Sequence, residues 1–179
     1  TALGFKLINS DRFFEKALKK AGLKLDPEDI ASVQGQELRG KAKLLTAVQT
    51  DLALRGRLGL IIDGTGRDYE KIKDQVNELR AIGYAVHMIF VNTDLETAIE
   101  RNNNRPRSLS IDVVTSSWKA VQNNIGKFQA LFRNRLTIVD NSEDSNIEKA
   151  TMSAYKRIMT WSKKPPENKI AQQWIKNQK

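Results

Sequence analysis

Apolar and polar positions along this chain follow two periods. Short apolar runs, typical of strands, alternate with longer stretches in which apolar residues recur every three or four positions, as they do in helices. The four apolar runs predicted as strands are residues 3–9, 58–63, 85–91 and 136–140. The run 58–63, LGLIID, is apolar on both faces, which is typical of a central strand in a parallel sheet.

Helical periodicity fills the segments between these runs. Helices are expected at residues 12–21, 26–55, 68–82, 94–102, 111–132 and 144–162. The segment 26–55 is interpreted as one long helix or as two helices broken near Gly35 and Gly40. Strands alternating with helices predict an α/β fold, with a parallel sheet, right-handed crossovers and helices on both faces. Ligands of such folds bind at the carboxyl ends of the strands.

The pattern predicts one main domain followed by a short tail. Residues 1–162 form the expected α/β domain, and residues 163–168 read as a linker. Residues 169–179 form a short helix that carries Ile170, Trp174 and Ile175 at helical spacing. This helix either docks on the parent domain or acts as a partner-binding peptide.

Composition excludes several classes of protein. With 179 residues and 40% hydrophobic content, the chain is long enough for one core. It has no cysteine, which excludes disulfides and thiolate metal sites, and its single histidine, His87, cannot by itself build an imidazole-based site. No apolar run approaches the roughly 20 residues of a membrane span, so we expect a soluble, cytoplasmic protein. A formal charge of +9 favours anionic partners, among them nucleotides and nucleic acids.

One stretch almost matches a phosphate-binding motif. Residues 35–42, GQELRGKA, satisfy G-x-x-x-x-G-K-[ST] except at the last position, where Ala42 replaces the hydroxyl that would hold Mg²⁺. The residues before it contain no apolar run long enough for the strand that the motif requires. The residues Leu38, Ala42, Leu45, Val48 and Leu52 recur instead at helical spacing. We therefore predict a helix that matches the motif by chance.

Polar residues follow each predicted strand, at the edge where ligands are expected. They are Asn9–Arg12, Asp63–Arg67, Asn92–Asp94 and Asp140–Asn141. Two carboxylates, a threonine hydroxyl and two arginines would thus meet at one rim, namely Asp11, Asp63, Thr65, Arg12 and Arg67. Each also has a structural interpretation: Asp11 as a helix cap, Asp63 as a partner of the following turn, and Arg67 as part of a solvated helix face.

Three segments resemble known kinases. Residues 5–13, FKLINSDRF, resemble the strand and acidic motif of small P-loop kinases. Residues 60–67, LIIDGTGR, are similar to the strand and turn of zeta-toxin-like kinases and of polynucleotide kinases, although zeta toxins usually carry glutamate where Asp63 stands. Residues 97–107, TAIERNNNRPR, resemble the lid of this family, expected here at about residues 101–110.

The resemblance implies a three-layer αβα sheet of P-loop NTPase type and a kinase reaction that uses Mg²⁺ and ATP or GTP. It implies that Asp11 is the base for the acceptor hydroxyl. The expected ligands of the acceptor are Arg12, Asp63, Thr65 and Arg67, with Asp63 also assisting Mg²⁺ through water. The arginines expected to close over the triphosphate are Arg101, Arg105 and Arg107, the first two acting in catalysis.

The family's phosphate loop follows a strand that comes before the first strand recognised here. We therefore expect the first strand and the loop to lie upstream in a longer protein, or to have been lost in a relic; this chain alone should be a very poor kinase. The acceptor is expected to be a nucleotide, a sugar nucleotide or a polynucleotide. The alternative is a non-catalytic module whose basic surface binds nucleic acid or a protein partner.

Several other residues have expected roles. The asparagines 102–104 predict a mobile lid that closes on nucleotide. Three aromatic residues are expected in the core rather than as platforms for bases, namely Trp118, Phe128 and Phe132. His87 lies within an apolar strand pattern and is interpreted as a hydrogen-bonded core residue rather than a catalytic one.

Overall fold

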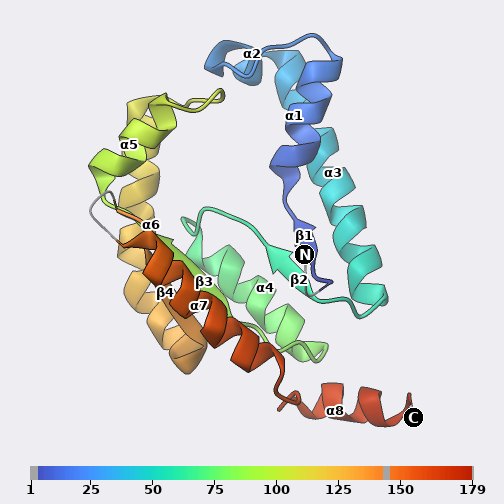
Figure 1. The fold of residues 1–179 in the computed structure, drawn as a ribbon. Helices are drawn as coiled ribbons and strands as arrows, with labels where there is room; N and C mark the ends of the chain where they lie inside the picture. Colours follow the sequence, from blue (N-terminus) through green and yellow to red (C-terminus); the bar gives the residue numbers. More distant parts are fainter. Residues whose placement is uncertain (1–3, 143–145, 179) are drawn as a thin grey trace. The chain divides into compact units, whose positions relative to one another are not determined.

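The computed structural model describes residues 4–142 and 146–178, which form helices and short parallel strands (Figure 1). The strands are β1 (Lys6–Ile8), β2 (Leu60–Ile62), β3 (Met88–Asn92) and β4 (Leu136–Asp140). The helices are α1 (Ser10–Lys20), α2 (Pro27–Ala31), α3 (Val33–Arg55), α4 (Tyr69–Ala81), α5 (Leu95–Asn103), α6 (Ile111–Phe132), α7 (Ile147–Ser162) and α8 (Lys169–Lys176), with a 3₁₀ turn at Arg133–Arg135. The contacts divide the chain into two compact units, one up to Thr65 together with Glu100–Val114, the other Gly66–Ile99 together with the residues from Thr115 onward.

The first unit is built around α1, α2 and α3. The first two of these helices contribute Phe14, Leu18 and Ile30 to a small apolar core, which Ala42 of α3 completes. α1 and α3 lie side by side, and Arg39 of α3 places its guanidinium 5.5 Å from the centre of the Phe14 ring (Figure 1). The core of this unit therefore lies between helices.

Residues 35–42 lie within α3, as predicted from their helical spacing. The helix begins after Ser32, whose hydroxyl accepts a hydrogen bond from the Gly35 N–H at 3.0 Å and donates one to the Asp29 carbonyl at 2.7 Å. The expected break near Gly35 and Gly40 is therefore wrong, because Ser32 supplies the cap that separates α2 from α3. The backbone of the GQELRGKA stretch follows a helix and does not form a phosphate loop.

The second unit is built around β3 and β4. Phe90 and Leu136 pack on one side with Val76 of α4 and with Phe128 and Phe132 of α6. The prediction that Phe128 and Phe132 are core residues is confirmed, since they are 0% and 4% exposed.

Helix α7 packs against β4. The ring of His87, directly before β3, lies 5.1 Å from that of Trp161 in α7. His87 Nε2 shares a hydrogen bond of 2.8 Å with the Thr137 hydroxyl of β4. His87 is therefore a hydrogen-bonded residue of this packed region, as expected.

The strands pair in parallel, as predicted, but in two separate sheets of two strands. β1 pairs with β2, with Ile8 opposite Ile62, and β3 pairs with β4, with Phe90 opposite Ile138. Among the described residues each strand thus has one edge without a partner strand. Apolar strand residues consequently remain in contact with solvent, and Ile61 is 41% and Val91 58% exposed. The expectation that 58–63 is a fully buried strand is wrong for this structure, and the complete three-layer sheet stays a prediction.

Several predicted boundaries match the structure closely. The helix at 111–132 and the strand at 136–140 have the predicted limits. The other strands are shorter than expected, and residues 85–87 lie outside β3. The predicted start of the last long helix, residue 144, falls outside the described residues, and α7 begins at Ile147. In residues 4–142 and 146–178, no helix combines the length and apolarity needed to cross a membrane.

Candidate functional site

The parallel pairing of β1 and β2 brings two polar residues together at the carboxyl ends of these strands. Asn9 follows β1 and Asp63 follows β2, and the Asn9 amide nitrogen donates a 2.7 Å hydrogen bond to a carboxylate oxygen of Asp63. Asp63 is exposed. Its hydrogen bond is therefore made across the strand pair to Asn9, and Asp63 lies at the strand end where ligands of such folds bind.

Asn9, rather than Ser10 or Asp11, caps α1. The Asn9 side-chain oxygen accepts a hydrogen bond from the backbone N–H of Asp11 at 2.7 Å. The structural interpretation of Asp11 as the helix cap is therefore wrong, because a neighbouring side chain already fills that role. The Asp11 carboxylate is therefore not needed to cap the helix, and its side chain is 46% exposed.

The carboxylate of Asp11 forms an ion pair with an arginine of the lid segment, residues 101–110. Arg107 Nη2 lies 3.0 Å from Asp11 Oδ2, and Arg107 Nη1 lies 3.8 Å from Glu15 Oε1. The Arg107 side chain is only 16% exposed, and its Nη1 atom is buried without a hydrogen-bond partner among the described residues. A buried donor without a partner costs about 1–3 kcal/mol, so this nitrogen would gain from an incoming oxygen ligand.

Asn102 holds the lid segment in shape. Its side-chain amide donates to the Leu109 carbonyl at 2.8 Å and accepts from the Leu109 N–H at 2.9 Å, so the chain is closed into a loop between these residues. The same oxygen accepts a hydrogen bond from Arg105 Nη2 at 3.0 Å. Asn102 is only 4% exposed.

The asparagines 102–104 do not all belong to the loop. Residues 102 and 103 end helix α5, and only Asn104 lies beyond it. The prediction of three loop asparagines is wrong because residue 102 continues the helical spacing of Leu95, Ala98 and Ile99 and is itself buried. Closure of the lid on nucleotide stays a prediction.

The remaining predicted residues of the first unit lie at the surface. Arg12 on α1 and Thr65 after β2 are exposed, and neither side chain bonds to another described residue. Arg101 and Arg105 are also exposed and lie at the start of the lid segment. The structure thus brings Asp11, Asp63 and Arg107 together with Asn9, while leaving the other side chains open to solvent.

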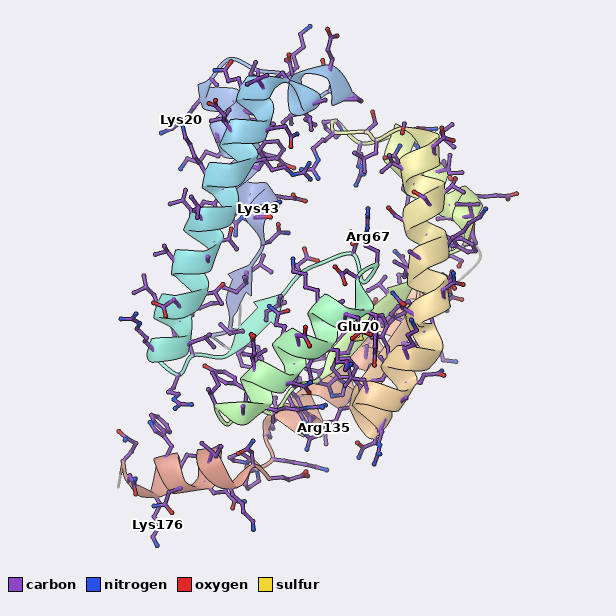
Figure 2. The ribbon with its side chains drawn as sticks, turned by 180° about the vertical axis from the view of Figure 1, so that it is seen from behind. Lys20, Lys43, Arg67, Glu70, Arg135 and Lys176 are labelled. Atoms are coloured by element: carbon purple, nitrogen blue, oxygen red, sulfur yellow. The ribbon has the colours of Figure 1, made fainter. Side chains whose placement is uncertain are left out.

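Arg67 belongs to the second unit, where it precedes α4 (Figure 2). Its Nη1 atom lies 3.4 Å from the Ser117 hydroxyl of α6, and the side chain is otherwise exposed. The buried amide of Asn124 donates to the carbonyls of Gly66 and Arg67 at 3.2 and 3.0 Å. The D-G-T-G-R turn is therefore fixed at its end by α6.

The polar residues after β3 mainly stabilise the local structure. Asp94 accepts hydrogen bonds of 2.7 Å from the backbone N–H and from the hydroxyl of Thr97, and these bonds lower the pKa of Asp94. Trp118 is half-buried and donates its indole N–H to the Thr93 carbonyl at 2.8 Å. Asp94 therefore opens α5, as predicted, and its oxygens are occupied by this task.

The residues at this site fit a partly hydrated Mg²⁺ rather than a closed metal site. Among the described residues, no group of three or more histidine, cysteine, aspartate or glutamate side chains lies close enough to hold a metal. Mg²⁺ in phosphoryl-transfer sites usually keeps several waters and binds one or two carboxylates plus substrate phosphates. The exposed carboxylate of Asp63, with one oxygen bonded to Asn9, meets this requirement.

Two residues of this site were expected in the region, Asn9 after the first strand and Asn102 in the lid, but their hydrogen-bonding roles were not predicted. The role of Asn9 could have been found from its place between a strand and a helix, where asparagine is a preferred cap. Asn102 could have been found as a polar residue on the apolar side of α5, although its partner Leu109 has no signal in the sequence. Its contacts depend on how the loop closes.

Comparison with known proteins gives one match. A family model described as an AAA domain matches residues 1–128. No curated protein and no solved structure matches the chain.

Proposed function

Because the chain belongs to the AAA domain family, a class of P-loop NTPase-like nucleotide-binding domains, we propose that it is the acceptor-binding part of a nucleotide-dependent kinase. The reaction would transfer a phosphoryl group from ATP or GTP to a hydroxyl of a nucleotide, a sugar nucleotide or a polynucleotide. The observation that carries this proposal is the position of Asp11. Its carboxylate is not used as a helix cap, is about half-exposed, and is paired with Arg107 of the lid segment.

Asp11 would orient the acceptor hydroxyl and take its proton. As the hydroxyl oxygen forms a bond with the γ-phosphorus, the bond between that phosphorus and the β,γ-bridging oxygen breaks, and the proton passes to the Asp11 carboxylate. Phosphoryl transfer depends mostly on positioning and on stabilising charge, so little further covalent chemistry is required from the protein. Arg12 and Thr65, which belong to the same unit as Asp11, would bind the acceptor.

The arginines of the lid segment would stabilise charge on the transferred group. Arginine binds phosphate oxygens through paired N–H donors, and such bonds are stronger than those between neutral groups. Arg107 is the best placed, because its buried Nη1 has no hydrogen-bond partner among the described residues. Arg101 and Arg105 would join it when the lid segment closes over the triphosphate.

Asp63 would hold Mg²⁺ through water. When bound, Mg²⁺ supplies positive charge that neutralises the phosphate oxygens. The hydrogen bond from Asn9 keeps the Asp63 side chain oriented at the end of β2. Asn9 thereby serves two residues of the site, since its oxygen also caps the helix that carries Asp11.

The loop that cradles the triphosphate would come from outside these residues. The near-match at 35–42 lies in α3, where the backbone N–H groups serve the helix. The open strand edges support an additional strand, because a sheet of only two strands is marginally stable. An upstream strand that ends in the phosphate loop would supply both missing parts.

The test is phosphoryl transfer by the protein of the complete reading frame, in its native form and as Asp11→Asn. We expect the variant to lose at least a hundredfold in kcat, because amide nitrogen cannot take the proton. Asp74→Asn, which removes an exposed carboxylate on α4, is the matched control and should keep full activity. Transfer by Asp11→Asn at the native rate, with circular dichroism showing a folded protein, would overturn the assignment of Asp11.

The alternative function is a non-catalytic module that binds nucleic acid or a protein. The same phosphoryl-transfer assay on the protein of the complete reading frame distinguishes it from a kinase. A module of this kind would show no phosphoryl transfer to any acceptor, with or without Mg²⁺ and ATP or GTP. The feature that favours it is a group of cations on α1 that lack acidic partners among the described residues.

A further inference from the structure

Helix α1 separates its apolar and basic residues onto opposite sides. Phe14 and Leu18 are 1% and 0% exposed and pack into the core of the first unit. The exposed cations of the helix are Arg12, Lys16, Lys19 and Lys20, at spacings of three, four and eight residues that place them on one face. We call these four residues the α1 basic face. Lys20, at its far end, extends outward from the first unit (Figure 2).

The α1 basic face has no acidic partners within the described part of the chain. None of its four side chains forms an ion pair or hydrogen bond there. Together with Glu15 they line a shallow depression of the surface. The charge of Glu15 is partly balanced by Arg107, whose Nη1 lies 3.8 Å away. The depression is therefore positively charged.

Helix stability does not account for this arrangement. Cations near the end of a helix interact favourably with its dipole, which is sufficient to explain Lys19 and Lys20. Arg12 lies in the first turn, where a positive charge is unfavourable, and Lys16 lies in the middle. The latter two residues extend the positive charge along the helix to the position next to Asp11.

We propose that the α1 basic face binds the phosphates of a single-stranded nucleic acid whose terminal hydroxyl reaches Asp11. The face runs from Arg12 to Lys20, a length of about 12 Å at 1.5 Å per residue. Along the helix axis Arg12 and Lys16 are about 6 Å apart, and Lys19 and Lys20 follow Lys16 at about 4.5 and 6 Å, which suits a chain of successive phosphates. A mononucleotide would occupy one end of it. The inference rests on the proposed function for the role of Asp11 and selects a polynucleotide among the possible acceptors.

The test measures binding without ATP, so that it does not depend on catalysis. The probe is a 12-nucleotide single-stranded DNA with a free 5′-hydroxyl and a 3′-fluorophore, followed by fluorescence anisotropy between 50 and 200 mM salt. Each phosphate neutralised on a single strand contributes about 0.7 to the slope of log K against log salt. We expect a slope of about −2.8 for four cations. In the triple variant Lys16→Gln, Lys19→Gln, Lys20→Gln, which keeps only Arg12, the slope should be about −0.7.

The matched control is Lys163→Gln, Lys164→Gln, Lys169→Gln, which removes the same charge from the linker and from the start of α8. It should keep the native slope and affinity. Equal losses in both triple variants would overturn the proposal, because binding would then depend on net charge alone. Absence of binding to the native chain would overturn it too, as would equal affinity for a nucleoside 3′-phosphate. If the protein binds the DNA but transfers no phosphoryl group, the proposed kinase function would be contradicted, while the α1 basic face would still be supported as a nucleic-acid-binding surface.

Discussion

At the scale of single residues, the candidate site depends on which side chain caps α1. Asn9, Ser10 and Asp11 follow one another, and each is a preferred cap, so the sequence alone could not assign the role. In the structure Asn9 takes it and also bonds to Asp63. The positions of the two carboxylates are therefore coupled through one amide. Loss of that amide in Asn9→Ala would disturb both.

His87 gives a prediction about pH. Burial, and then the charges of Arg157 and Arg135, lower its pKa to about 4 from the ordinary value of 6.5. The unfolded chain therefore binds a proton below about pH 6.5 that the folded chain does not bind until about pH 4. We expect the free energy of unfolding to fall as the pH is lowered from 6.5 to 4, measured by urea denaturation at several pH values.

The comparison variant is His87→Gln, which removes the only histidine of the chain. Its stability should depend less on pH between 5 and 6.5, a range in which few carboxylates titrate. A native protein whose stability is constant across that range would contradict a half-buried, neutral His87.

At the scale of elements, glycine substitutions in α3 test whether the near-match to the phosphate-loop motif at 35–42 is simply part of a helix. A Cβ added at Gly35 would lie 2.8 Å from the Ile30 carbonyl oxygen, whereas one added at Gly40 would meet nothing within 4 Å. Gly35→Ala should therefore destabilise the protein by about 1–3 kcal/mol, the range for overpacking. Gly40→Ala should stabilise it by roughly 0.5–1 kcal/mol, because alanine favours a helix. Urea denaturation measures both changes.

The Gly40→Ala variant also tests the phosphate-loop interpretation, through its affinity for Mg²⁺-ATP. In a phosphate loop both glycines bring the backbone close to the ligand, so Gly40→Ala would weaken nucleotide binding. The helical interpretation requires that the affinity of the complete protein for Mg²⁺-ATP stay unchanged in Gly40→Ala. A large loss of affinity in that variant would contradict it.

The lid segment depends on Asn102. Asn102→Ala removes both hydrogen bonds to the Leu109 backbone, and we expect a loss of about 1–3 kcal/mol, the cost of leaving buried polar groups unpaired. The Leu109 amide should then exchange its hydrogen faster. Asn104→Ala, the same substitution at an exposed position, is the control and should leave that rate unchanged. Equal exchange rates in the two variants would show that Asn102 does not close the loop.

Elements with a strong periodic pattern were predictable from the sequence. The helix α6 and strand β4 have their predicted limits, because their apolar spacing is regular over the whole element. The break at Ser32 was missed because glycines in α3 were taken as stops, although Gly35 is needed for close packing against α2. The contacts from Asn102 to Leu109 and from Asp11 to Arg107 join residues distant in sequence, and no local pattern reports such pairs.

At the scale of the whole molecule, the two sheets of two strands require explanation. Parallel strands are normally covered on both faces, yet Ile61, Val91 and Ile138 are 41%, 58% and 48% exposed. The sequence predicted four parallel strands but not their division into two sheets. Which strands pair is determined by contacts between residues distant in the chain, and the spacing of apolar residues does not report those contacts. An additional strand would pair with an open edge of a two-stranded sheet, in keeping with the proposed upstream strand, whereas covering these side chains requires an element packed on the face of the sheet.

In the proposed kinase, these residues hold the acceptor and the base while a loop outside them holds the triphosphate. Calorimetric titration of Mg²⁺-ATP into this chain and into the protein of the complete reading frame separates these two parts. We expect binding by the longer protein and none by residues 1–179 alone. Equal binding by both would show that these residues hold the nucleotide themselves. No binding by the folded longer protein would contradict the kinase proposal.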